Sequence, residues 1–73
     1  MLVQFTGAAY SLDEIGDKVW HERGPVWVNP RMVSAVYDHT IMLPGYKINV
    51  MEDLEQIRAK IRAYRPGFLR RRE

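Results

Sequence analysis

Residues 26–50, VWVNPRMVSAVYDHTIMLPGYKINV, decide the fold, because they alternate short β-prone runs with turn-forming residues. Asn29-Pro30 ends the first run at a corner, since proline has no N–H to offer a central strand. Asp38-His39 separates the next two runs by the spacing of a tight hairpin, and Pro44-Gly45 supplies the following turn. The stretch therefore predicts an antiparallel meander with strands over residues 26–28, 33–37, 40–43 and 46–50.

After Met51 the hydrophobic period changes from two residues to about 3.6, which indicates a helix. The residues of its apolar stripe are Leu54, Ile57, Ile61 and Tyr64. Acidic residues precede basic ones along this segment, which complements the helix dipole, and Pro66-Gly67 ends it. A helix with one apolar stripe must dock on the sheet. The sequence thus predicts an α+β fold, a small antiparallel β-meander or half-barrel of about four to five strands with a C-terminal α-helix packed on it.

The segment before residue 26 allows two interpretations. Residues 1–6 alternate in polarity and predict a first strand that ends at a glycine turn. Residues 12–22 are favoured as a short helix, because a Ser-x-x-Glu capping box begins at Ser11 and apolar residues follow at helical spacing. The alternative is a strand over residues 18–21 that faces residues 26–28. A glycine inside the segment weakens the helix by about 1 kcal/mol relative to alanine, so the choice between a helix and an extra strand stays open.

Length and composition bound the organisation of the chain. Its 73 residues, 47% hydrophobic and 27% charged, are typical of one small globular domain. We expect residues 1–65 to form this α+β domain and residues 66–73 to form a basic, flexible tail. A chain this short buries only roughly 60% of its unfolded surface, and without cysteine it has neither disulfides nor Cys-ligated metal. Self-association is the remaining way to stabilise the folded chain, so we expect a homo-oligomer.

The hydropathy and charge of the sequence indicate where the protein is located and which partners it has. The sequence holds no apolar run of about 18–20 residues, and its start lacks the pattern of a signal peptide. We therefore expect a cytoplasmic protein, of a bacterium or of a phage-infected bacterial host, with no membrane insertion. The net charge of +2 comes mainly from arginines near the C-terminus, which is weak support for nucleic acid as a partner.

Within residues 26–65, an Asn-Pro strand end is followed by a strand, a strand that begins with threonine, a glycine turn, another strand, and a helix with acidic residues at its start. The residues that carry this pattern are Val28, Asn29, Pro30, Val33, Val36, Thr40, Ile41, Met42, Leu43, Gly45, Lys47, Val50, Glu52, Glu55, Ile57, Lys60, Ile61, Tyr64 and Arg65. The pattern resembles the small FlbD/SwrD-type flagellar and swarming-motility proteins, and phage genomes carry short proteins of similar appearance. The resemblance implies this fold and a non-enzymatic accessory role. Residues 8–25 and the arginine-rich tail depart from the family pattern.

No residue set amounts to recognisable catalytic chemistry. His21 and His39 lie 18 positions apart without carboxylates at metal-ligand spacing. Ser11 and Ser34 have no neighbouring base, and glycine-rich phosphate loops are absent from the sequence. We expect no enzyme activity, no cofactor and no metal site.

The aromatic residues indicate binding. Trp20 and Trp27 are expected in the core or at an interface, and Trp27 is the leading interface residue because it is out of phase with its valine neighbours. Aromatic rings with nearby cations could also stack a base and hold a phosphate. The candidate ligand-binding residues are Arg31, Tyr37, His39, Tyr46 and Lys47.

Three classes of function follow from these features. The favoured one is a small binding or accessory protein that acts through oligomerisation and a protein partner. The second is a phage-type inhibitor that sequesters a host protein or a small nucleotide in pockets between subunits. The third is a nucleic-acid-binding module, which rests on the tail and the aromatic residues.

Overall fold

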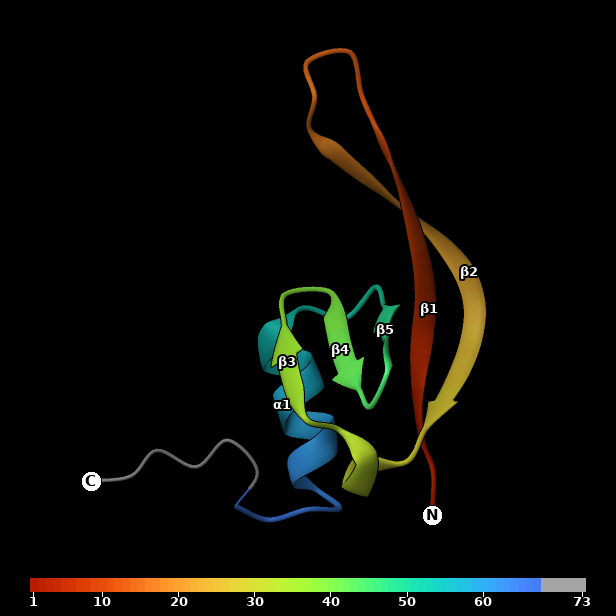
Figure 1. The fold of residues 1–73 in the computed structure, drawn as a ribbon. Coiled ribbons are helices and arrows are strands. Elements are labelled where there is room, and N and C mark those ends of the chain that lie inside the picture. Colours follow the sequence, from red (N-terminus) through yellow and green to blue (C-terminus); the bar gives the residue numbers. More distant parts are fainter. Residues whose placement is uncertain (68–73) are drawn as a thin grey trace, which may run out of the picture.

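The computed structural model describes residues 1–67, so most of the basic tail expected over residues 66–73 lies outside the described residues. Five antiparallel strands form two small sheets and are followed by one helix, which confirms the predicted α+β class (Figure 1). The strands of residues 1–67 do not close into a barrel. In chain order, the elements are β1 (Val3–Leu12), β2 (Lys18–Val28), the 3-10 helix η1 (Pro30–Met32), β3 (Ala35–Tyr37), β4 (Thr40–Leu43), β5 (Tyr46–Asn49) and α1 (Leu54–Arg62).

The helix favoured over residues 12–22 is wrong. Residues 18–21 are extended, as in the alternative, but they do not face residues 26–28: both segments belong to the one strand β2, which pairs with β1. β1 and β2 pair from Val3 opposite Val28 as far as Leu12 opposite Lys18. Asp13 does not start a helix, because its carboxylate accepts from the backbone N–H of Ile15 (3.0 Å) and of Asp17 (2.8 Å) and closes a tight turn. The residues at helical spacing have no surface to cover: the side chains of Leu12, Ile15 and Val19 are 63%, 82% and 41% exposed.

Gly7 does not end the first strand, as the sequence predicts, but marks a β-bulge within it. The register shifts between Gly7 and Ala8, so that Arg23 is an extra residue on β2. A Cβ at Gly7 would lie 3.0 Å from the carbonyl oxygen of Gly24, which explains the glycine at this close approach. Beyond the bulge, the hairpin leaves the rest of the molecule as a projecting arm (Figure 1). We call residues 8–23 the arm and the remaining described residues the body.

The second sheet has the order β3-β4-β5 and contains both predicted hairpins. His39 adopts a φ of 60° in the turn between β3 and β4, and Gly45 a φ of 83° in the turn between β4 and β5. Gly7 forms an isolated bridge with Val50, and the N–H of Met51 donates to the carbonyl of Thr6 (2.8 Å). The two sheets therefore meet along β1 and the end of β5.

The helix α1 closes the core. Asp53 and Gln56 form a capping box at its start, and the Asp38 carboxylate accepts from the N–H of Leu54 (3.0 Å). Its buried stripe is narrower than predicted, since Leu54 is only partly buried and Tyr64 is 47% exposed. Both sheets, the helix and the loop before β3 contribute to one core. Its members are Val3, Phe5, Val28, Val33, Val36, Ile41, Leu43, Val50, Ile57 and Ile61.

Glu52 and Lys60 connect β1 to the C-terminal half of the body. The N–H of Thr6 donates to both carboxylate oxygens of Glu52 (3.1 Å each). The ammonium of Lys60 donates to the carbonyl of Gln4 (2.8 Å) and to Glu52 (3.4 Å). Partial burial raises the pKa of the Glu52 carboxyl, but hydrogen bonds from the N–H groups of Thr6 and of Glu52 itself, with the charge of Lys60, outweigh it and leave this pKa below its usual value.

We expect Glu52→Gln to lower the free energy of unfolding at pH 7 by roughly 1–3 kcal/mol, because a charged acceptor is lost from a backbone donor. A depressed pKa in the folded state contributes stability above the ordinary glutamate pKa of about 4.3, and this stability is lost as the pH falls through the lowered folded value. Urea unfolding between neutral and acidic pH measures both effects. Glu55→Gln is the matched control, since Glu55 is 79% exposed and pairs only with Arg58. An equal loss in the two variants would contradict the role of Glu52.

Candidate protein-binding groove

An apolar groove lies between η1, the β4–β5 turn, the start of β1 and the end of β2. These four elements meet at the end of the body opposite the arm (Figure 1). The apolar groove has a volume of about 280 Å³. The residues that line it are Leu2, Trp27, Val28, Asn29, Met32, Leu43, Pro44, Tyr46 and Ile48. We call this feature the groove. It collects residues from four parts of the sequence.

Local structure explains why large side chains point into solvent around the groove. Strand alternation buries Val28 in the core and leaves the preceding Trp27 58% exposed. The Asn29 side chain accepts from the N–H of Arg31 (3.0 Å), and the Asn29 carbonyl accepts from the N–H of Met32 (3.0 Å). This corner starts η1 and carries Met32 to the rim of the groove.

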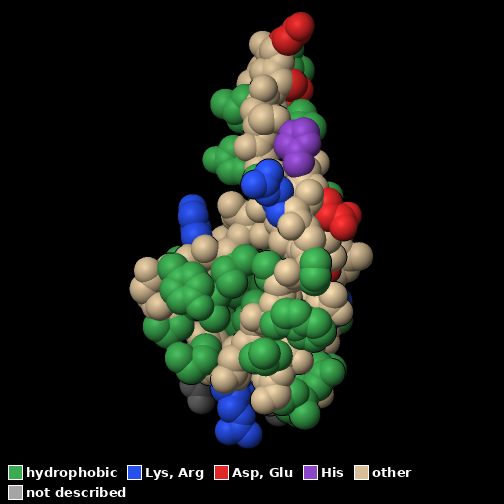
Figure 2. All heavy atoms as spheres, turned by 90° about the vertical axis from the view of Figure 1, so that its right-hand side faces the viewer, with side chains coloured by type: hydrophobic (Ala, Val, Ile, Leu, Met, Phe, Trp, Pro, Cys, Tyr) green, Lys and Arg blue, Asp and Glu red, His purple; other side chains and the backbone are tan. Residues whose placement is uncertain are grey.

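Four large side chains that line the groove are about half exposed. Leu2, Trp27, Met32 and Tyr46 are between 49% and 60% exposed, although each is large and apolar or aromatic. Figure 2 shows hydrophobic side chains gathered over this part of the body, with charged side chains mainly along the arm and at the margins. Contiguous exposed apolar surface of this kind marks interaction sites.

The chemistry of the lining favours apolar side chains over a charged small molecule. The described lining residues include no Lys, Arg, His, Asp or Glu. The side-chain oxygen of Asn29 is already engaged by the backbone of Arg31. The groove volume also falls at the lower limit of typical small-molecule pockets, roughly 300–1,000 Å³. A phosphate placed here would meet no cation from the lining.

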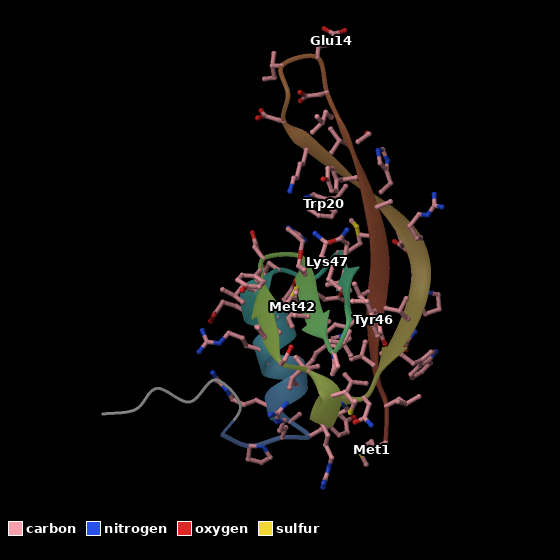
Figure 3. The ribbon with its side chains drawn as sticks, in the orientation of Figure 1. Met1, Glu14, Trp20, Met42, Tyr46 and Lys47 are labelled. Carbon is pink, nitrogen blue, oxygen red and sulfur yellow. The ribbon has the colours of Figure 1, made fainter. Side chains whose placement is uncertain are left out.

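The five candidate ligand-binding residues do not converge on one site. Tyr46 lines the groove, whereas Arg31 lines a separate hollow beside η1. Lys47 extends to the opposite side of β5 from Tyr46 (Figure 3). His39 bonds through Nδ1 to the carbonyl oxygen of Val50 (3.1 Å), and Tyr37 is exposed on β3 without lining the groove. The stacking face and the cations predicted from sequence are therefore separated by the fold.

Trp20 lies outside the groove, where it holds the arm against the body. Its ring stacks on His39 with centroids 4.7 Å apart and tilts against Tyr10 at 5.2 Å. The ammonium of Lys18 stands 4.5 Å from the Tyr10 centroid and 5.8 Å from that of Trp20. This contact fixes the approach of the arm to the β3–β4 turn. The structure thus gives the two tryptophans different places, with Trp20 between arm and body and Trp27 on the surface.

The outer edge of β2 is a poor template for strand addition. The N–H and the carbonyl of Thr6 bond to Glu52 and Met51, so both point away from β2. Thr6 and Pro25 are opposite each other and form a non-hydrogen-bonded pair of the antiparallel ladder. The backbone groups of Pro25 therefore point away from β1, toward the outer edge of β2. Proline has no N–H to donate, and the bulge at Arg23 lies two residues before it on the same strand. The row of backbone hydrogen-bonding groups along this edge is therefore interrupted, so a partner strand is less well accommodated here than apolar side chains are in the groove.

Sequence reasoning missed most of the groove. Leu2, Met32 and Pro44 carry no functional signal, since each lies at a strand end, a corner or a turn. Their only shared property is exposed apolar surface, which depends on how distant segments pack.

Within residues 1–67, no three His, Cys, Asp or Glu side chains form a group that could hold a metal ion. The one helix of the described residues is too short and too polar to cross a membrane.

No family model matches the chain, and neither a curated protein nor a solved structure is significantly similar to it. The resemblance to FlbD/SwrD-type proteins therefore stays a prediction.

Proposed function

We propose that this is a non-enzymatic binding or accessory protein that works as a homo-oligomer and engages a protein chain through the groove. The observation that carries the proposal is the set of four half-exposed large side chains, Leu2, Trp27, Met32 and Tyr46, around a lining without charged residues. Tryptophan, tyrosine and methionine are enriched at protein interfaces, and an aromatic anchor in an apolar hollow is the usual centre of a binding hot spot.

The alternatives have less support from the same geometry. Sequestration of a small nucleotide needs cations next to a stacking face, but none of the described residues that line the groove with Tyr46 is a cation. Arg31 lines the adjoining hollow, and Lys47 lies on the opposite face of β5. A nucleic-acid-binding role rests mainly on tail arginines beyond the described residues. Capture of a host protein by a phage-type inhibitor would use the groove in the same way as an accessory protein.

The biological setting proposed from the resemblance is motility, as in FlbD/SwrD-type accessories. The genes beside this one discriminate the settings: a flagellar operon supports an accessory role, and a phage early region supports an inhibitor. Either setting is compatible with a protein ligand in the groove.

Photo-crosslinking at the groove tests the proposal. Replacing Tyr46 with a photoreactive phenylalanine analogue should give covalent adducts to protein chains after illumination in cells. The matched control is the same replacement at Tyr37, because the two tyrosines are 60% and 59% exposed but only Tyr46 lines the groove. Adding Trp27→Ser should reduce the Tyr46 adducts, since Trp27 forms part of the same lining.

Two results would contradict the groove as a protein-binding site. One is an absence of protein adducts at Tyr46, and the other is an equal yield at Tyr37. Calorimetric heat with mono-, di- or cyclic nucleotides that Arg31→Ala abolishes would instead establish the sequestering alternative.

A further inference from the structure

We propose that the groove of one copy receives the tip of the arm of a second copy, so that the chains associate head to tail. The tip is defined as residues 12–17. This inference rests on the proposed function of the groove as a protein-binding site, and it names the segment that occupies it.

The tip presents two apolar side chains that the described part of the chain leaves largely exposed. Ile15 is 82% exposed and Leu12 is 63% exposed, which makes them, after Met1, the most exposed large hydrophobic residues within residues 1–67. The turn holds Ile15 outward, because the Asp13 carboxylate fixes the backbone N–H groups of Ile15 and Asp17. An aliphatic side chain on a fixed turn is the kind of group that an uncharged groove of about 280 Å³ can accommodate.

The arm has little support from its own body. A two-stranded hairpin is marginally stable in water unless it packs on further structure. Below the tip, the arm contacts the body through the stack of Trp20 on His39. The radius of gyration, 13.0 Å, exceeds the roughly 11 Å of a compact domain of this length, because the arm projects from the body. Burial of the tip against a second copy would supply the missing packing.

Charge selects a head-to-tail arrangement. Three acidic residues, Asp13, Glu14 and Asp17, surround the apolar side chains of the tip. At the other end of the molecule, Arg31 follows the Asn29-Pro30 corner beside the groove. Arg65 reaches the same corner, where its guanidinium donates to the carbonyls of Pro30 (3.0 Å) and Val33 (2.8 Å).

The two ends lie at opposite extremes of a molecule 42 Å long, as the labels of Glu14 and Met1 show (Figure 3). Tip-to-tip contact would bring like charges together, whereas tip-to-groove contact pairs opposite charges. Such complementarity steers association and fixes its orientation. A contact between two different surfaces closes into a ring when the rotation between neighbours allows it, and otherwise extends as a filament.

Light scattering of purified variants tests this arrangement. The wild type should show a mass of at least two chains of 8.6 kDa, with less association at high salt. The tip variant Leu12→Ser with Ile15→Ser, and the groove variant Trp27→Ser, should each be monomeric. Tyr37→Ser is the control with matched exposure and should keep the wild-type mass. Circular dichroism verifies folding, and Met32→Ser replaces Trp27→Ser if the latter does not fold.

Mixing the tip variant with the groove variant is the decisive measurement. The tip variant keeps an intact groove and the groove variant keeps an intact tip, so the mixture should form a pair of chains although neither component associates alone. A monomeric wild type, an unchanged mass of the tip variant, or a mixture that stays monomeric would each overturn the proposal. If crosslinking at Tyr46 still captures another protein in those cases, the groove keeps its proposed function and only self-docking is rejected.

Discussion

Phe5→Ala should lower the free energy of unfolding by about 3–5 kcal/mol, the largest effect that we expect from a single substitution in this protein. Phe5, on β1, is 1% exposed. It belongs to the core that both sheets and the helix share. The Lys60 ammonium stands 5.2 Å from its ring centroid, so the substitution also removes a surface on which the Glu52–Lys60 connection rests. Chemical denaturation followed by tryptophan fluorescence measures the change.

Two further variants keep the Phe5 measurement informative. Phe5→Leu retains most of the side-chain volume and should lose less stability than Phe5→Ala, which helps if the alanine variant does not fold. Tyr37→Ala removes an aromatic ring that is 59% exposed and should cost less than about 1 kcal/mol. All variants are compared at one protein concentration, because association adds to apparent stability. Similar losses at Phe5 and Tyr37 would show that Phe5 is not a core residue.

Ile57→Ala and Ile61→Ala should each lower the free energy of unfolding by about 2–5 kcal/mol. Both side chains are 0% exposed and belong to the core, where α1 packs on β3. Leu54, on the same stripe, is only partly buried and should show a smaller loss when it is replaced by alanine. The measurement is again the denaturation midpoint and slope. An unchanged midpoint in either isoleucine variant would contradict the docking face of the helix.

The local signals in the second half of the chain predict the structure well. Asp38-His39 and Pro44-Gly45 form the expected turns, and the helix starts and ends within a few residues of its predicted limits. Each of these features depends on residues close together in sequence. Proline geometry, glycine at positive φ and a 3.6-residue period act over one or two turns of chain, so the sequence is sufficient to predict them.

The N-terminal hairpin shows where local reasoning fails. Ser11, Asp13 and Glu14 satisfy the rules for a helix start, yet Asp13 closes a turn and the Ser11 hydroxyl lies 2.9 Å from Nε2 of His21. A short helix at this position would have needed a surface for its apolar stripe. The pairing of β1 with β2 instead uses every residue from Val3 to Leu12. Long-range strand pairing outweighed a local capping pattern.

Composition and spacing determined the α+β class, the two hairpins of β3, β4 and β5, the C-terminal helix and the exposure of Trp27, because these depend on short-range geometry and on which residues must avoid water. The predicted place of residues 26–28 as the first strand of the same meander is wrong, since these residues pair with β1 in the other sheet. Only the tertiary structure decided that Trp20 holds the arm, that Arg31 lines a different hollow from Tyr46, and that Leu2, Trp27, Met32 and Tyr46 surround one groove. Their positions relative to one another are set by the bulge at Gly7, the corner at Asn29-Pro30 and the shared core. Those features join segments that are far apart in sequence, and no local pattern encodes the distance between two such segments.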